Sequence, residues 1–418
     1  MGLRRRYRII SALLYEKFDK EINLAQKAAI VFSLLTLLSG IMLSSAMAAS
    51  SIKIGILLPL TGRQASFGQI QRKSVLMAAA EINAGGGVNG EKIELIIADT
   101  QGNPDAGRAA VEKLISRDKI LLIGGGISSS VTWAATSIAQ QKKTAFLVIS
   151  ASADKITEQN WDFIFRLNQP VSEHLETMAS FIKKVATDIK SVAIVHANSL
   201  QSSAEARNLF KKAEALDLKI VSRESFETGT QEFRPLLIRV KSRNPDLLYM
   251  VTDDGNDAAR LTRLSKELNL SPKLFVGGTL GFALQEFEKN AGIAANYVVY
   301  PTQWTTSVPY PGAKEYNTKF IDTYHTAPTY YGAQAYAAIY VMADALKRTK
   351  VLTPEKVRDA LAKTNMMTLL GPVKFISYNK KSQQNRLPTF LAQWLNGKAE
   401  IIWPLNFSTK KAIYPIPK

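Results

Sequence analysis

The feature that most constrains the fold is an alternation of apolar runs of strand length with amphipathic stretches of helix length. The apolar runs are nearly continuous, which is typical of strands covered on both faces of a sheet. They occupy residues 52–58, 93–98, 120–123 and 145–150. Between the first two runs, Val75, Ala78, Ala79 and Ile82 form the apolar stripe of a helix that lies on a sheet. This βαβα order predicts an α/β fold with a parallel sheet.

The same alternation resumes after Pro170. Further strands are predicted at 192–196, 220–222, 247–251 and 274–277, with helices at 204–215, 258–268 and 282–291 between them. More helices follow at 312–324, at 331–349 and after Pro354, and the turn Asn396-Gly397 joins two apolar runs as in a β-hairpin. A chain of 418 residues is too long for one ordinary core. The sequence therefore predicts two α/β lobes.

The first 48 residues have the order of a secretory signal. Arginines and lysines come first, an uncharged apolar run covers 28–42, and the small residues Ala46 and Ala48 end the segment. This order predicts export to the periplasm, with cleavage after Ala48. The alternative is a retained membrane anchor, because the uncharged stretch 28–51 is about as long as a spanning helix.

Composition excludes several classes of function. The chain has no cysteine, which excludes disulfides, thiolate metal sites and thiol nucleophiles. Its three histidines, at 174, 196 and 325, lack metal-ligand spacing, so no metal site is predicted. The formal net charge is +18, but the lysines are scattered along helices without interleaved aromatics, so no nucleic-acid partner is predicted.

A glycine-rich loop follows the predicted strand 120–123. It reads Gly-Gly-Gly-Ile-Ser-Ser-Ser over residues 124–130 and precedes a helix at 131–141. Free backbone N–H groups at a helix start receive carboxylate or phosphate, and hydroxyls at the cap assist them. Ser128 is the first candidate for a side-chain contact with a ligand. The alternative reading is a helix cap beside a tight turn.

This loop does not match the known nucleotide or hydrolase patterns. The pattern G-x-G-x-x-G fails at Ser129, and no acidic residue stands ~20 positions further on for a ribose contact. A phosphate-binding G-x-x-x-x-G-K is absent, and Ser130 replaces the second glycine of a G-x-S-x-G elbow. No cofactor is therefore predicted.

Two other loops follow predicted strands. Ser-Ala-Ser-Ala-Asp at 150–154 should line the same crevice as Ser128, because ligands bind at the carboxyl ends of parallel strands. Asp154 could accept from an ammonium group or cap a short helix. Asp253 and Asp254 follow the strand 247–251, and Thr279 follows the next strand. Adjacent carboxylates without a nearby histidine more often start a helix than hold a metal.

Four motifs carry a resemblance to a known family. They are Ile-Lys-Ile-Gly-Ile-Leu-Leu-Pro-Leu-Thr-Gly at 52–62, Ala-Ser-Phe-Gly at 65–68, Glu-Ile-Asn-Ala-Gly-Gly-Gly-Val-Asn-Gly at 81–90 and Asp-Thr-Gln-Gly-Asn-Pro at 99–104. Over roughly residues 52–405 the chain resembles the extracytoplasmic solute-binding proteins of ABC transporters, specifically the leucine/isoleucine/valine-binding family with the type I periplasmic binding fold.

The resemblance implies two doubly wound, parallel-sheet lobes joined by three hinge crossovers, near 168–172, 299–304 and 370–373. Lobe 1 would comprise 49–168 plus 304–370, and lobe 2 would comprise 169–303 plus 371–418. A ligand bridging the lobes favours the closed state, which would dock on the membrane permease of an ABC transporter.

The resemblance also implies contacts for an amino-acid ligand. Ser128 matches the serine that holds the α-carboxylate, Ser152 matches the backbone carbonyl that takes the ammonium group, and Phe67 matches an aromatic that packs on the ligand side chain. Asp154 stands where the family has a hydroxyl. With their neighbours, the candidate ligand-binding residues are Phe67, Ser128, Ser129, Ser152, Ala153, Asp154, Asp253 and Thr279.

Two positions depart from the family's amino-acid binders. Asp253 replaces a tyrosine, and Thr279 replaces the glutamate that pairs with the ammonium group. Either Asp154 or Asp253 supplies the missing carboxylate, or the ligand is an aromatic or aliphatic carboxylate.

The expected function is capture of a small carboxylate-bearing solute, such as a branched-chain amino acid, for an ABC importer, without enzymatic activity. Alternatives are a binding protein for another organic acid or amide, a ligand sensor for a signalling partner, and an α/β enzyme. The last is disfavoured by the missing nucleophile, metal and cofactor patterns.

Overall fold

The computed structural model describes residues 29, 51–278, 280–306 and 308–417. The predicted signal segment, Ala29 apart, and Thr279 lie outside the described residues. From Ile52 onward the chain forms one compact unit. Among the described residues no helix is both long enough and apolar enough to span a membrane.

The first sheet has eight strands in the order β11-β12-β13-β5-β4-β3-β1-β2. Its strands are β1 (Ser51–Leu58), β2 (Lys92–Asp99), β3 (Leu122–Gly125), β4 (Ala145–Val148), β5 (Ile164–Arg166), β11 (Asn365–Thr368), β12 (Gly371–Tyr378) and β13 (Lys381–Asn385). Neighbouring strands from β1 through β3, β4 and β5 to β13 are parallel, whereas β12 is antiparallel to both of its neighbours.

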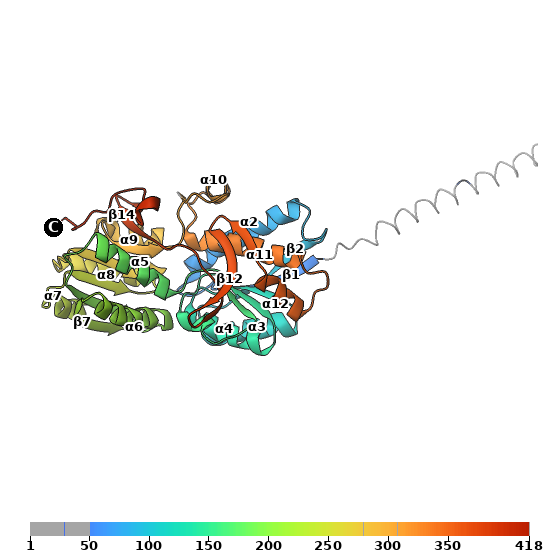
Figure 1. Cartoon of the computed structure of the whole chain (residues 1–418), viewed down its shortest axis with the longest axis horizontal. Helices are drawn as coiled ribbons and strands as arrows, with labels where there is room; N and C mark the ends of the chain where they lie inside the picture. Colours follow the sequence, from blue (N-terminus) through green and yellow to red (C-terminus); the bar gives the residue numbers. More distant parts are fainter. Residues whose placement is uncertain (1–28, 30–50, 279, 307, 418) are drawn as a thin grey trace, which may run out of the picture. The chain divides into compact units, whose positions relative to one another are not determined.

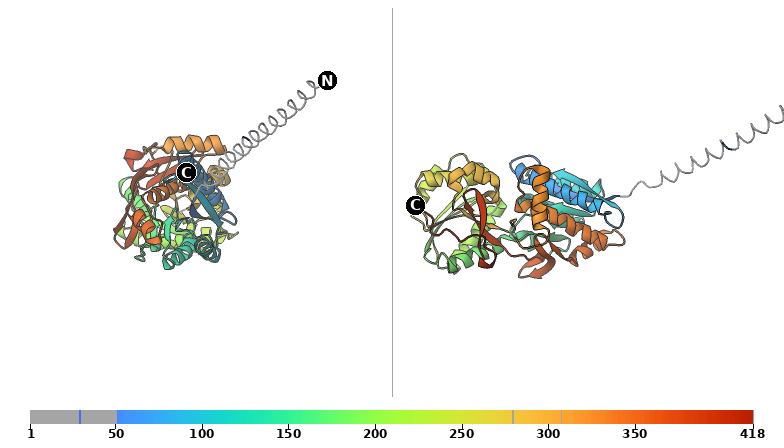
Figure 2. Two further views of the ribbon diagram at one scale, coloured as in Figure 1. Left: turned by 90° about the vertical axis from the view of Figure 1, so that its right-hand side faces the viewer. Right: turned by 90° about the horizontal axis from the view of Figure 1, so that it is seen from above.

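Helices cover both faces of this sheet (Figure 1). They are α2 (Ala65–Ala84), α3 (Pro104–Ser116), α4 (Ser129–Gln141), α11 (Tyr330–Lys347) and α12 (Pro354–Ala362). A further helix, α10 (Ala313–Tyr324), packs on α2 and α11. α2 packs against α11 on one face, and the blue and orange helices lie side by side in the right-hand view of Figure 2. α3 packs against α4 on the other face, where Val111, Leu114 and Ala139 bury their side chains against Phe146 of the sheet. We call this sheet and its helices the first lobe.

The second sheet has seven strands in the order β15-β14-β10-β9-β8-β6-β7. Its strands are β6 (Ser191–Ala197), β7 (Lys219–Phe226), β8 (Leu247–Val251), β9 (Leu274–Gly278), β10 (Val299–Thr302), β14 (Phe390–Leu395) and β15 (Lys398–Trp403). The five strands from β7 to β10 are parallel, and β14 and β15 form the predicted antiparallel hairpin.

The helices of the second sheet are α5 (Val171–Lys184), α6 (Leu200–Ala215), α7 (Arg234–Lys241), α8 (Gly255–Glu267) and α9 (Gln285–Ala291). α5 packs against α6, and α8 packs against α9 (Figure 1). We call this sheet and its helices the second lobe. Two parallel-dominated sheets covered by helices confirm the predicted α/β fold class.

The third crossover differs from its expected place. It was predicted near 370–373, with residue 371 opening lobe 2, but β12 and β13 belong to the first sheet. β13 pairs in parallel with β5, and Gln384 lies opposite Arg166. The chain therefore leaves the first sheet after Asn385. The sequence did not predict β13, because its residues Lys-Ser-Gln-Gln-Asn show no alternation of apolar and polar side chains. The other expected lobe boundaries remain predictions.

Two glycines shape the turn from β3 into α4. Gly125 and Gly126 have φ angles of 145° and 91°, which side chains rarely adopt. A Cβ at Gly125 would lie 2.3 Å from the carbonyl oxygen of Leu57, and one at Gly126 would lie 2.6 Å from Thr132 Oγ1. The two glycines thus let the turn pack directly on β1, and they place Ser128 at the start of α4.

Candidate functional site

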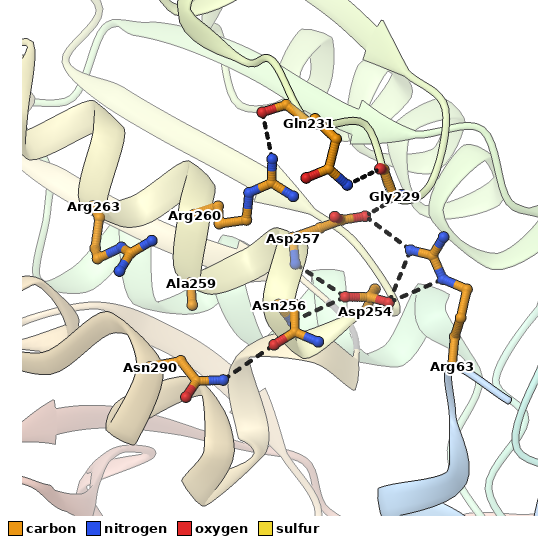
Figure 3. Close-up of a pocket in the computed structure, with 10 residues that line it drawn as sticks. All are labelled: Arg63, Gly229, Gln231, Asp254, Asn256, Asp257, Ala259, Arg260, Arg263 and Asn290. Carbon is orange, nitrogen blue, oxygen red and sulfur yellow. Dashed lines mark hydrogen bonds and ion pairs between the residues drawn. The ribbon is translucent and has the colours of Figure 1, made fainter. Parts of the chain in front are cut away.

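The loop between β1 and α2 reaches the second lobe through Arg63. Its guanidinium Nη2 lies 3.0 Å from Asp254 Oδ2 and 3.7 Å from Asp257 Oδ2, while Nη1 donates to the Thr228 carbonyl at 3.1 Å. Figure 3 shows the Arg63 side chain meeting both aspartates. Asp254 also caps α8, because its Oδ1 accepts from the backbone N–H groups of Asn256 and Asp257. Arg63 is therefore a direct ionic link between the lobes.

Two cavities share Arg63 and Asp254 in their walls. The larger, of about 540 Å³, is drawn in Figure 3 and is lined mainly by α8 and the loop at Gly229. The smaller, of about 190 Å³, lies between the β3–α4 turn and the loop after β8. Its walls comprise Arg63, Gln64, Gln101, Gly102, Ser128, Ser130, Thr228, Asp253 and Asp254. We call this smaller cavity the cleft; it brings together Ser128 and Asp253, two of the residues predicted from sequence.

Ser128 is the N-cap residue of α4, but its hydroxyl makes no capping hydrogen bond. The hydroxyl lies 3.0 Å from that of Ser130, and the Ser128 carbonyl accepts from Thr132 N–H and Oγ1. A side-chain cap, the alternative reading of this serine, is therefore absent. The hydroxyls of Ser128 and Ser130 and the start of α4 line one wall of the cleft.

Asp253 lines the opposite wall and is 6% exposed. Its carboxylate accepts from the Ser199 hydroxyl, whereas Oδ1 has no hydrogen-bond partner among the described residues. Burial raises the pKa of Asp253, and the charges of Asp254 and Asp257 add to that rise. Asp254 starts the helix, as expected for one of this aspartate pair, and leaves Asp253 without a capping role.

The loop after β4 is engaged in protein contacts. The Ser152 carbonyl accepts from Val171 N–H at 2.8 Å, and the Ala153 carbonyl accepts from Arg166 Nη1 at 2.7 Å. Ser129 Oγ accepts from Ala153 N–H and donates to Gln201 Oε1, both at 3.2 Å. Ser129, Ser152 and Ala153 do not line the cleft, so their part in ligand binding stays a prediction.

Asp154 also joins elements of the two lobes. It pairs with Lys381 Nζ at 2.9 Å and accepts from Ser172 Oγ and from Asn208 Nδ2, the last at 3.1 Å. Burial opposes ionisation, but the Lys381 charge and the Ser172 hydroxyl outweigh it and lower the pKa of Asp154. An ionised Asp154 with three partners is satisfied without a ligand, and its predicted contact with an ammonium group is untested.

Phe67 lies on α2 with 1% of its surface exposed. Its ring meets that of Tyr331 edge-on at 5.0 Å, and Tyr331 in turn contacts Tyr330, whose hydroxyl donates to that of Tyr331. The predicted aromatic contact thus belongs to a buried aromatic group at the start of α11. Its contact with a ligand remains a prediction.

Glu205 on α6 was missed by the sequence reasoning. It is fully buried, and its Oε1 accepts from the Tyr249 hydroxyl at 2.7 Å. Oε2 has no hydrogen-bond partner among the described residues. Burial raises the pKa of Glu205 to about 8, although the Tyr249 hydrogen bond lowers it. In the sequence Ser-Ala-Glu-Ala-Arg nothing distinguishes this glutamate from one on a solvent-exposed face.

A chain of buried glutamine amides and one serine hydroxyl connects the first lobe to two of the crossovers. Gln71, Ser150, Gln334 and Gln303 are linked in that order by hydrogen bonds of 2.6–2.8 Å. Gln303 Oε1 also accepts from Gln169 N–H, and Gln303 Nε2 donates to His174 Nε2 at 2.9 Å. Burial lowers the pKa of His174 to about 4, so its ring is neutral at pH 7. No cluster of three His, Asp or Glu side chains in the described part of the chain is placed to hold a metal.

The model of the family described as periplasmic binding protein matches residues 51–399. The chain belongs to this family. As a periplasmic binding protein it is a solute-binding protein of the ABC transporter type and not an enzyme. The predicted resemblance to leucine/isoleucine/valine-binding proteins is confirmed: the Leu/Ile/Val-binding protein homolog 7 of Brucella melitensis is 26% identical over 393 residues, covering 91% of this chain and 97% of that protein.

Solved structures agree with the fold of this periplasmic binding protein. A branched-chain amino acid transporter substrate-binding protein of Streptococcus pneumoniae, in complex with isoleucine, has a TM-score of 0.77 at 23% identity and covers 85% of this chain and 100% of its own. An ABC transporter solute-binding protein of R. palustris, in complex with benzoate, has a TM-score of 0.75 at 20% identity and covers 84% of this chain and 96% of its own.

Proposed function

We propose that the protein binds a small carboxylate-bearing solute, most simply an amino acid, in the cleft and delivers it to an ABC importer. The observation that carries this proposal is that Ser128 of the first lobe and Asp253 of the second lobe both line the cleft. One wall offers the Ser128 hydroxyl, which caps nothing, and the other offers Asp253 Oδ1, which has no hydrogen-bond partner among the described residues. Such a pair is complementary to the two charged groups of an amino acid.

The carboxylate end of the solute would lie at the start of α4. The first backbone N–H groups of a helix have no partners within the helix, and the helix dipole favours a negative charge there. The hydroxyls of Ser128 and Ser130 can donate to the same carboxylate. A cleft of about 190 Å³ is smaller than the ~300–1,000 Å³ of drug-sized pockets, which favours a small solute.

Contact with both walls would couple binding to closure. A ligand shifts a two-state equilibrium only by the difference in its affinity for the two states. A solute held by Ser128 in the first lobe and by Asp253 in the second gains both sets of contacts only when the lobes are closed. The closed form would then be what the membrane permease recognises.

The export predicted from the sequence supports the same role. The cationic, apolar and small-residue order of residues 1–48 is that of a secretory signal, and the family is periplasmic. We propose that the segment is cleaved after Ala48 and that the protein acts in the periplasm.

A second candidate ligand is an aromatic or other organic acid. It is favoured by the threonine at position 279, where an amino-acid binder of this family has an acid, and by the benzoate in one structural neighbour. Such a ligand would use Ser128 but would leave Asp253 without a cationic partner.

A thermal-shift screen of amino acids, aromatic acids and amides identifies the ligand class. A true ligand at about 100 times its dissociation constant adds about 2.7 kcal/mol to the free energy of unfolding. Calorimetry of the Ser128→Ala variant with that ligand then tests the site. We expect a loss of about 1.5–3 kcal/mol, because the ligand charge loses a hydrogen bond.

Ser137→Ala is the matched control for Ser128→Ala. Ser137 lies on the same helix, and its hydroxyl donates to the Ala134 carbonyl within α4. The control variant should bind as the wild type does. Undiminished affinity in Ser128→Ala would contradict the proposed carboxylate contact.

A further inference from the structure

A third cavity lies in the first lobe and shares no lining residue with the cleft. It holds about 280 Å³ and is bordered by α2, α10, α11 and the edge strand β11. We call it the tyrosine pocket, after Tyr316, Tyr336 and Tyr340 in its walls. Because the elements that border it all belong to the first lobe, separation of the two lobes would leave this pocket intact.

The carboxylate of Glu81 is the polar centre of the tyrosine pocket. It accepts from the Tyr340 hydroxyl at 2.7 Å, and also from the Tyr336 hydroxyl and from Lys319 Nζ. Burial opposes ionisation, but the hydrogen bonds from Lys319, Tyr336 and Tyr340 outweigh it and lower the pKa of Glu81. The pocket therefore contains an ionised carboxylate at pH 7.

Aromatic rings and thioethers surround this carboxylate. The ring centroid of Tyr336 lies 4.7 Å from that of Tyr316 and 5.1 Å from that of Tyr340, so the three rings form a continuous row. Met366 and Met367 of β11 also line the pocket, and Met367 is 54% exposed. Methionine side chains adapt to ligands of varied shape. Apolar walls around a few convergent polar groups are typical of small-molecule sites.

The charge of the tyrosine pocket is opposite to that of the chain. Among the described residues that line it, Glu81 and Glu315 supply two carboxylates, and Lys319 supplies the one ammonium group. The chain as a whole has a net charge of +18. An acidic pocket in a basic protein favours a cationic ligand. The faces of the tyrosine rings favour a cation as well, because they carry negative charge density.

Lys319 already shows how a cation is held in this pocket. Its ammonium group pairs with the Glu81 carboxylate, although 56% of its side chain is exposed to solvent. An ion pair with so exposed a partner contributes little to stability. The lysine can therefore withdraw into solvent when an ammonium group from solution takes its place on Glu81.

We infer that the tyrosine pocket is a second ligand site, which binds an organic amine with an apolar aromatic body. The ammonium group of the amine replaces Lys319 Nζ on the Glu81 carboxylate. The aromatic body packs on the tyrosine rings and on the two methionines of β11. This site acts independently of the solute in the cleft, whatever that solute is.

Calorimetry at pH 7 tests the inference with three probes that share one phenethyl body, namely phenethylamine, phenethyl alcohol and phenylpropionate. We expect phenethylamine to bind about tenfold or more tightly than the alcohol, because a hydrogen bond between two charged groups is stronger than one to a neutral donor. Phenylpropionate should bind most weakly, because its charge repels Glu81. Glu81→Gln keeps an acceptor for the tyrosine hydroxyls and should weaken phenethylamine binding about tenfold or more.

Two further variants test the place of the amine. Lys319→Met should strengthen phenethylamine binding up to about fivefold, because Glu81 loses the lysine that competes with the ligand. Met367→Lys should weaken it, because the new lysine places a second cation at the pocket. Since Met367 is exposed, this variant stays informative even where Glu81→Gln fails to fold, and thermal unfolding verifies each fold. Leu352→Lys is its matched control, because Leu352 is 40% exposed and does not line the pocket.

Four results would overturn the inference. The first is unchanged phenethylamine affinity in Glu81→Gln and Met367→Lys. The second is equal wild-type affinity for phenethylamine and phenylpropionate, or no binding of phenethylamine at all. The third is a loss of binding in Asp253→Asn but not in Glu81→Gln, which would place the amine in the cleft. The fourth is a dimer that Met367→Lys dissociates, which would assign the pocket to a second copy of the chain.

Discussion

The guanidinium of Arg63 lies 3.0 Å from the carboxylate of Asp254, and this ion pair ties the β1–α2 loop to the first turn of α8. The pair forms part of the wall of both cavities. Asp254 is buried and held by its capping bonds, whereas the Arg63 side chain is 52% exposed. Arg63 is therefore the partner that must move when the lobes separate.

Replacing Arg63 by glutamine should weaken ligand binding modestly. A half-exposed ion pair contributes about 0.2–1 kcal/mol, which corresponds to an about 1.4- to fivefold loss of affinity through a less stable closed state. Calorimetry at low and high salt measures the dissociation constants of both proteins. Added salt should weaken the binding of the ligand to the wild type more than its binding to the variant. Arg117→Gln, which breaks an exposed pair with Asp118, is the control. An unchanged dissociation constant in Arg63→Gln would show that the ion pair does not support closure.

Replacing Gly125 by alanine should disrupt both stability and binding. The new Cβ would clash with the Leu57 carbonyl at a φ of 145°, and overpacking with left-handed backbone strain costs about 3 kcal/mol or more. Denaturant unfolding measures the loss of stability, and a binding titration measures the loss of ligand affinity. Gly86→Ala shares a positive φ but meets no atom within 4 Å, so it should cost only about 1 kcal/mol and leave binding intact. Equal losses in the two variants would contradict the packing argument.

His174 should make the protein less stable in acid. Its folded pKa of about 4 lies below the unfolded value, so below pH 6.5 the unfolded state binds the proton more tightly. The stability from the neutral ring is complete above pH 6.5 and is lost as the pH falls toward 4, by about 1.4 kcal/mol per unit. His174→Gln removes this loss. Unfolding titrations of both proteins between pH 4 and 7 should therefore converge in acid, and parallel curves would contradict the prediction.

Glu205 should make the ligand-free protein less stable as the pH rises, which is the opposite of the effect of His174. Its folded pKa of about 8 lies above the unfolded value, so stability is complete below pH 4.5 and falls as the pH rises toward 8. Glu205→Gln keeps an acceptor for Tyr249 and removes the titration, which should stabilise the variant relative to the wild type by about 3 kcal/mol at pH 7. Melting curves at pH 5 and 8 test this. A variant that is equally destabilised at both values would point to a packing role instead.

The sequence predicted the parts of the fold that depend on local periodicity. Apolar strands such as β1 and β8, and the glycine turn that presents Ser128, follow from patterns a few residues long. β13 was missed because it is held by polar contacts rather than apolar burial: Gln384 accepts from Arg166 Nε and donates to the Asn168 carbonyl.

The sequence predicted residues of the site only where a single loop, read on its own, indicated their position. Asp154 gave no local sign of its ion pair with Lys381, which stands far along the chain. Glu205 looks like a surface residue until α6 is packed on β8 and β9. The burial of a side chain by distant elements is a property of the assembled fold, and a single sequence does not display it.

The central claim is that one solute is held from both lobes, by Ser128 and by Asp253. The most direct measurement is the calorimetric affinity of the amino acid that stabilises the protein most, for the wild type and for Ser128→Ala and Asp253→Asn. We predict that each substitution weakens binding about tenfold or more, since each removes a hydrogen bond to a charged group. Wild-type affinity in both variants would contradict the claim.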